Sequence, residues 1–85
     1  MIKLQFEQRT NGLWVAELDG GTSYRIEMHP GPLRPDYDLR FVERRPDSWA
    51  RGGWSPRYVR VSTHRSLERA IERANRHHRN RAKGA

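Results

Sequence analysis

The chain has 85 residues, of which 34% are hydrophobic and 32% are charged, and its net charge is +7. This length fits one domain and leaves no room for a second hydrophobic core. Because cysteine is absent, disulfides and thiolate zinc sites are excluded, and because no apolar run reaches about 18 residues, no membrane-spanning segment is expected. The default expectation is a cytoplasmic protein. The low hydrophobic fraction raises disorder as an alternative, which the periodic apolar residues of 2–62 exclude for that segment.

The positive charge is concentrated in the second half of the chain. Residues 1–43 contain five basic and seven acidic residues, whereas residues 44–85 contain twelve basic and three acidic ones. Fifteen of the seventeen basic residues are arginine, which binds phosphate through paired hydrogen bonds and stacks on aromatic rings. This asymmetry favours an anionic partner. Codon bias in a GC-rich genome is the competing explanation for the arginine excess.

The first third of the chain predicts three consecutive strands. Apolar and polar residues alternate over 2–7, 13–18 and 24–28, as they do in half-buried strands. Asn-Gly at 11–12 and Asp-Gly-Gly at 19–21 separate these segments, and such sequences take the positive φ angles of tight turns. Connections this short predict an antiparallel meander.

The middle of the chain predicts two further strands and a long loop. Three prolines in 29–35 end the third strand, and alternation over 37–41 predicts a fourth. Residues 45–56 have a proline near each end and two glycines inside, which is typical of a loop. A fifth strand is predicted over 57–62, with Val59 and Val61 on one face.

One helix is predicted to start after Ser66, a favourable N-cap residue. Its apolar stripe consists of Leu67, Ala70, Ile71, Ala74 and His78. The helix is expected to fray around 79–82, which leaves 81–85 as a basic tail. The predicted fold is therefore a single α+β domain over 1–80: an antiparallel four- to five-stranded meander, either an open sheet or a small barrel, with one C-terminal helix packed on it.

The first candidate site is the basic helix, whose cations can contact phosphates and release counterions. The predicted nucleic-acid-binding residues are Arg69, Arg73, Arg76, Arg79, Arg81 and Lys83 on the helix, with Arg51, Arg57 and Arg60 before it. The alternative is a solvated helix end whose cations complement the helix dipole. That effect fades within the last turn and needs fewer cations than are present.

The second candidate site is the loop of residues 49–54 and the strand after it. Trp49, Trp54 and Tyr58 are interleaved with arginine and glycine in a segment expected to be exposed. Such a set can stack on bases or anchor a protein interface. The alternative is that one or both tryptophans fold back to cover a sheet edge or the end of the core.

The sequence therefore predicts a small basic nucleic-acid-binding protein, with DNA and RNA both open, as a monomer or homodimer. The alternative is a non-enzymatic interaction module, an accessory or inhibitor protein that docks on an acidic partner protein through residues 49–54. No catalytic residues are expected, because no nucleophile motif, phosphate-binding loop or metallohydrolase signature is present. No cofactor or metal is expected, since the four histidines lack the spacing of metal ligands.

Overall fold

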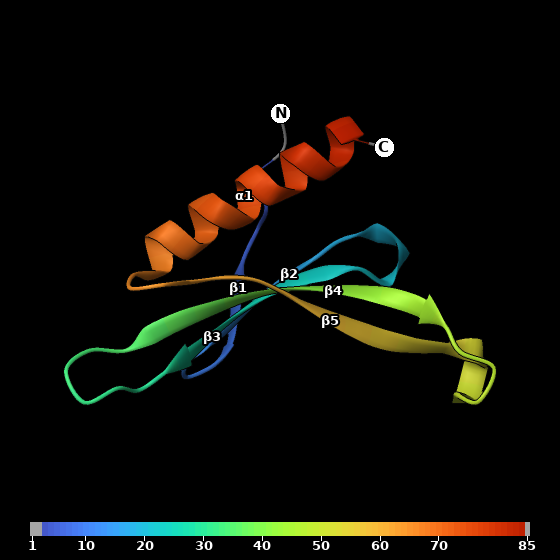
Figure 1. Cartoon of the computed structure of the whole chain (residues 1–85), viewed down its shortest axis with the longest axis horizontal. Coiled ribbons are helices and arrows are strands. Elements are labelled where there is room, and N and C mark those ends of the chain that lie inside the picture. The colour runs from blue at the N-terminus through green and yellow to red at the C-terminus, as the bar shows by residue number, and fades with distance from the viewer. Residues whose placement is uncertain (1–2, 85) are drawn as a thin grey trace.

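One antiparallel sheet forms the body of the molecule, and one helix crosses one of its faces (Figure 1). The computed structural model describes residues 3–84 and the side chains of residues 3–81. The elements are β1 (Glu7–Thr10), β2 (Leu13–Glu17), β3 (Ser23–His29), β4 (Asp36–Pro46), β5 (Trp54–His64) and α1 (Leu67–Gly84), with short 3-10 turns η1 (Asp19–Gly21) and η2 (Arg51–Gly53). The strands pair in chain order, and within the described residues β1 does not pair with β5. The predicted α+β meander with a C-terminal helix is confirmed, and the sheet is open rather than a barrel.

The turns lie where the glycine-containing pairs predict them. Gly12 connects β1 to β2 with a φ of +96°, and its carbonyl accepts a hydrogen bond from Met28 N–H at 2.8 Å. Gly21, in η1, has a φ of +77°, and a Cβ at this position would collide with the side chain of Arg44 on β4. Glycine is therefore favoured here by its backbone angle, and a larger residue would also have to displace the Arg44 side chain.

The N-terminal segment is extended but is not paired in the sheet over residues 3–6, so the predicted strand over 2–7 is wrong for these residues. Leu4 is buried and Phe6 packs against the core, as the alternation predicts. The backbone N–H of Leu4 donates instead to Oδ1 of Asn75 on α1, at 2.8 Å. The alternation of apolar and polar residues indicates which side chains are buried. It does not indicate which group accepts the hydrogen bonds of the backbone N–H groups. Ile2 lies outside the described residues.

The β4–β5 hairpin is longer than the sequence predicts. Arg44 pairs with Pro56 and Pro46 pairs with Trp54, so only residues 47–53 form the connection. The predicted loop over 45–56 is therefore wrong at both of its ends. Two prolines suggested a loop, but Pro46 ends β4, and β5 is an edge strand, the place in a sheet where proline is tolerated.

The hydrophobic core lies between α1 and the sheet face that it covers. Tyr24, Ile26 and Leu39 on the central strands are fully buried. Ala70 and Ala74 face them from α1 and are also 0% exposed, and these small side chains allow the helix to approach the sheet closely. Trp14, Leu18, Tyr37, Val59, Val61, Leu67 and Ile71 are partly buried around this centre.

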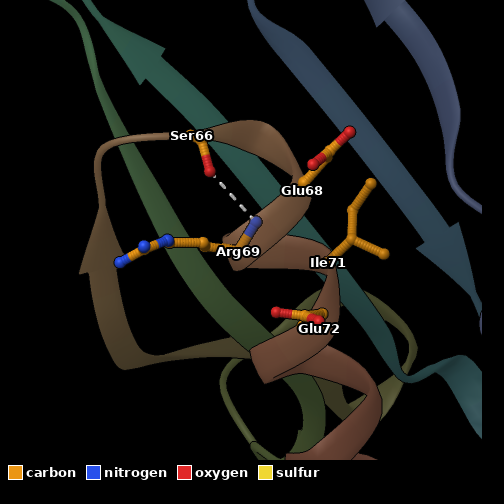
Figure 2. Close-up of a pocket in the computed structure, with 5 residues that line it drawn as sticks. All are labelled: Ser66, Glu68, Arg69, Ile71 and Glu72. Atoms are coloured by element: carbon orange, nitrogen blue, oxygen red, sulfur yellow. Dashed lines mark hydrogen bonds between the residues drawn. The ribbon is translucent and has the colours of Figure 1, made fainter.

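The helix begins as predicted. Ser66 Oγ accepts a hydrogen bond from the N–H of Arg69 at 3.2 Å, which satisfies one of the free donors at a helix start (Figure 2). The helix continues through Gly84, past the residues 79–82 at which fraying was expected.

Candidate functional site

Three arginines lie together along one side of α1. At about 100° per residue, Arg69, Arg73 and Arg76 fall within an arc of about 60°, to one side of the apolar stripe. We call these three residues the helix flank. Together with Glu72 and with His64, the last residue of β5, they line an open groove of about 390 Å³, the flank groove.

The helix flank differs from the sheet arginines in how its charge is neutralised. Among the described side chains, no carboxylate lies within 4.0 Å of the helix-flank guanidinium groups. By contrast, five sheet arginines each lie within that distance of a carboxylate: Arg9, Arg25, Arg40, Arg57 and Arg60. These five sheet arginines therefore neutralise the protein's own acids. The three arginines of the helix flank are not paired in this way, although Glu72 in the lining of the flank groove offsets part of their charge.

The lowered pKa of His64 indicates that the flank groove has a positive potential. Burial lowers the pKa of His64 from 6.5, and the positive charges of Arg73 and Arg69 lower it further. A hydrogen bond of 2.7 Å between His64 Nε2 and Ser62 Oγ orients the ring. The charges that disfavour a protonated imidazole here would favour a bound anion.

The other helix cations do not join the helix flank. The guanidinium of Arg81 lies 4.0 Å from the ring centroid of Phe41, where it covers the end of the core. Arg79 is exposed and lies three residues beyond Arg76, and it does not line the flank groove. The side chain of Lys83 lies outside the described residues. Of the six helix cations that the sequence predicts for phosphate contact, the structure groups three.

A polar contact between β3 and α1 helps to hold the helix on the sheet. Tyr24 and His77 approach to 2.7 Å between the phenol oxygen and Nδ1. Burial lowers the pKa of His77, as do the charges of Arg73, Arg81 and His78. Burial raises the pKa of Tyr24, against the influence of Arg81 and Arg73. Both shifts favour the neutral pair, in which the phenol donates to an unprotonated Nδ1.

The hairpin tip, which we define as residues 47–53, presents Trp49 to solvent with 96% of its surface exposed. The tip is internally hydrogen-bonded. Asp47 N–H donates to the Gly53 carbonyl at 2.9 Å, Trp49 N–H donates to Asp47 Oδ1 at 3.0 Å, and Gly53 N–H donates to the Ala50 carbonyl at 3.0 Å. Trp49 does not fold back onto the core, and Arg51 stands exposed beside it in η2.

The other two predicted aromatic residues lie on the sheet face away from α1. Tyr58 pairs with Val42 on that face, and Trp54 lies on the same side four residues earlier in β5. Arg44 lies 5.4 Å from the Trp54 ring and Arg25 lies 5.7 Å from the Tyr58 ring. The structure therefore does not bring Trp54 or Tyr58 together with the helix flank. Arg44 was missed because the predicted fourth strand ended before it.

Two further predicted arginines are held by ion pairs. Arg57 lies 3.5 Å from Glu43. On the face away from α1, Arg60 lies 3.2 Å from Asp38. Asp38 is 5% exposed, and burial alone would raise its pKa. The hydrogen bond from Thr63 and the charges of Arg60 and Arg40 outweigh burial, so the pKa of Asp38 is lowered. The cluster around Asp38 stabilises the sheet and leaves little free charge for a ligand.

Other surface features are poorer sites. A hollow of about 440 Å³ at the start of α1 is lined by Ser66, Glu68, Arg69, Ile71 and Glu72 (Figure 2), and its two carboxylates oppose an anion. Within residues 3–81, no three His, Cys, Asp or Glu side chains gather as metal ligands would. The described helix is too polar to cross a bilayer.

No protein-family model, curated protein or solved structure matches this chain.

Proposed function

We propose that this protein binds nucleic acid and that the helix flank is its phosphate-binding surface. The observation that supports this most directly is the contrast in ion pairing. Five of the seven arginines on the sheet strands are matched to carboxylates, whereas Arg69, Arg73 and Arg76 line an open groove with no carboxylate within 4.0 Å of their guanidinium groups among the described side chains. Because guanidinium groups bind phosphate oxygens through paired hydrogen bonds, a polyphosphate is the ligand that suits this row.

The spacing of the helix flank suits a repeating anion better than a single one. The rise along the helix is about 6 Å from Arg69 to Arg73 and about 4.5 Å from Arg73 to Arg76, so the three groups form a line. Each phosphate that such a line neutralises releases condensed counterions. The affinity should therefore fall as salt rises, with a logarithmic slope of about 0.7–0.9 per contact.

The test is fluorescence anisotropy with labelled single-stranded DNA, duplex DNA and RNA over a range of salt concentrations. The double variant Arg69→Gln/Arg76→Gln should weaken binding to every probe and lower the salt slope by about 1.4–1.8. A control with the same change in charge is Arg9→Gln/Arg34→Gln, since both of these arginines are exposed and lie in β1 and in the β3–β4 loop. We expect the control to change affinity much less.

Two results would contradict the proposal. If the control weakened binding as much as the helix-flank variant, only net charge would matter and the helix flank would not be a site. If no probe bound at about 0.15 M salt, or if binding were independent of salt, phosphate contact would be excluded as the function.

A further inference from the structure

Trp49 offers an apolar surface that a ligand could cover, because folding leaves its ring in water. Burial of a large aromatic side chain is favourable, and Trp is among the residues that most often dominate binding interfaces. Here the ring is 96% exposed on a tip ordered by four internal hydrogen bonds. A ligand that covers the ring would gain this burial at a small further cost in conformational entropy.

The charge around Trp49 indicates that the ligand is anionic. Within the hairpin, residues 43–57 contain Arg44, Arg45, Arg51 and Arg57, but only Glu43 and Asp47 as acids. Glu43 is already paired with Arg57, at 3.5 Å. Asp47 hydrogen-bonds the backbone of the tip itself, through Trp49 N–H. The remaining charged residues of 43–57 are Arg44, Arg45 and Arg51, so this end of the hairpin is mainly cationic.

The hairpin tip and the flank groove lie at opposite ends of β5. Strand β5 starts at the tip and ends at His64, which lines the flank groove, and α1 packs against β5 (Figure 1). The long axis of the molecule is 44 Å. A flexible strand of about 20 nucleotides is at least about 68 Å long at a rise of 3.4 Å per nucleotide, so it can reach both surfaces.

We propose that Trp49 stacks on an unpaired base, so that the nucleic acid bound by this protein is single-stranded. This inference rests on the proposed function. Bases of a single strand offer free faces to an aromatic ring, whereas inserting a ring into a duplex requires unstacking of a base step. Trp54 and Tyr58 suit this role less well, because Arg44 and Arg25 lie against their rings on the opposite sheet face from α1.

The experiment compares single-stranded and duplex DNA of the same sequence, about 20 nucleotides long, by anisotropy at about 0.15 M salt. The wild type should prefer the single strand. Trp49→Ala should weaken single-strand binding about tenfold and change duplex binding less than about twofold, since stacking depends on an accessible base. Because Trp49 is exposed, the variant should unfold at the wild-type temperature, which circular dichroism checks.

Two control variants separate stacking from loss of apolar surface. Trp49→Phe keeps an aromatic ring and should retain most of the preference for the single strand. Leu33→Ala removes a side chain that is 94% exposed in the β3–β4 loop and should leave both affinities unchanged.

The outcomes distinguish this inference from the function on which it rests. If Trp49→Ala left single-strand affinity unchanged, or lowered single-strand and duplex affinity equally, stacking on an unpaired base would be ruled out. In either case the helix-flank variant would still test phosphate binding independently. If the wild type bound no nucleic acid, the proposed function itself would fail, and an acidic protein would become the partner to test for Trp49.

Discussion

At the scale of single residues, Arg73 influences two histidines that are far apart in the sequence. Its charge lowers the pKa of His64 at the end of β5 and that of His77 in α1, in each case after the effect of burial. His77 also contacts the buried Tyr24. Because a pKa that differs between the folded and unfolded states makes stability depend on pH, the charge of the helix flank affects the stability of the fold through these two histidines.

The first residue-scale prediction concerns the pH dependence of stability. The folded-state pKa of His77 lies below its ordinary 6.5, so the unfolded chain takes up a proton first as the pH falls. The free energy of unfolding should be level above pH 7.5 or so, and it should fall as the pH drops through about 6.5 toward the folded-state pKa. The pKa of His64 is lowered as well, so His64 adds to the fall in the free energy of unfolding over the same pH range. Asp38 stays ionised across this range, because its pKa is lowered from 3.8.

The variant His77→Gln tests this assignment. Its amide oxygen can accept the Tyr24 hydrogen bond but does not titrate, so the loss of stability between about pH 7.5 and 5 should be smaller than in the wild type. Urea denaturation at several pH values measures this loss of stability. His64→Gln/His77→Gln should flatten the dependence further. An unchanged pH profile in both variants would show that other groups cause it.

At the scale of elements, Asn75 joins the N-terminal segment to α1 in place of a strand. Its Oδ1 accepts the Leu4 N–H at 2.8 Å, and its Nδ2 donates to the Ile71 carbonyl at 3.0 Å. Buried or half-buried backbone donors need a partner, and this segment has no neighbouring strand to supply one. One polar side chain in the helix therefore holds the N-terminal segment against the core.

Replacement of Asn75 should loosen this attachment. Asn75→Ala leaves the Leu4 N–H without its acceptor and should destabilise the protein by about 1–3 kcal/mol. Asn75→Asp keeps the acceptor and should cost less. Amide hydrogen exchange at Leu4 gives the local measurement. Exchange should accelerate in the alanine variant and stay close to wild type in the aspartate variant. Equal acceleration in both variants would show that the hydrogen bond is not what protects this amide.

The edge strand β5 has features that oppose pairing with another strand. It contains Pro56, which lacks an N–H, and the charged residues Arg57 and Arg60. Its pairing with β4 shifts between Leu39 and Arg40, which leaves Val61 as an extra residue in a bulge. Natural proteins use such features to prevent edge-to-edge association. A partner is therefore more readily bound through side chains of the hairpin tip and the helix flank than through added strand pairing.

At the scale of the whole molecule, the chain is elongated. Its Cα radius of gyration is 13.8 Å, whereas a compact domain of this length has about 12 Å. Its accessible surface is 6546 Å², whereas a compact protein of this mass exposes about 5,300 Å². The β4–β5 hairpin extends away from the part of the sheet that α1 covers (Figure 1). The protein thus presents more surface than its core requires, and its net charge of +7 is distributed over that surface.

Salt should affect stability and binding in opposite directions. Screening reduces repulsion within a chain of net charge +7, while the exposed ion pairs of the sheet contribute little to stability. We expect the unfolding temperature to rise by a few degrees between about 0.02 and 0.2 M sodium chloride. Nucleic-acid affinity should fall over the same range. A falling unfolding temperature in a calorimetric scan would mean that the sheet ion pairs outweigh the repulsion.

Local pattern was sufficient for most of the fold. Alternation located β2, β3 and the central part of β4, glycine pairs located the turns, and Ser66 with the apolar stripe located α1. These features depend on residues within one element, so the sequence contains them directly. The ends of the hairpin were missed because proline at 46 and 56 is compatible with either a loop or an edge strand. Such a segment is an edge strand when another strand pairs with it on one side, and it is a loop when no strand pairs with it.

For the candidate site, composition and residue order were enough to show that the second half of the chain is rich in arginine and that tryptophan and tyrosine lie among those arginines. Which arginines stay unneutralised, and which aromatic residue stays uncovered, depends on the folded arrangement of the elements. Arg60 meets Asp38 across two strands, although 22 positions separate them in the chain. Ion pairing and exposure depend on distances between elements, and strand register and helix packing set those distances. Composition cannot reveal them.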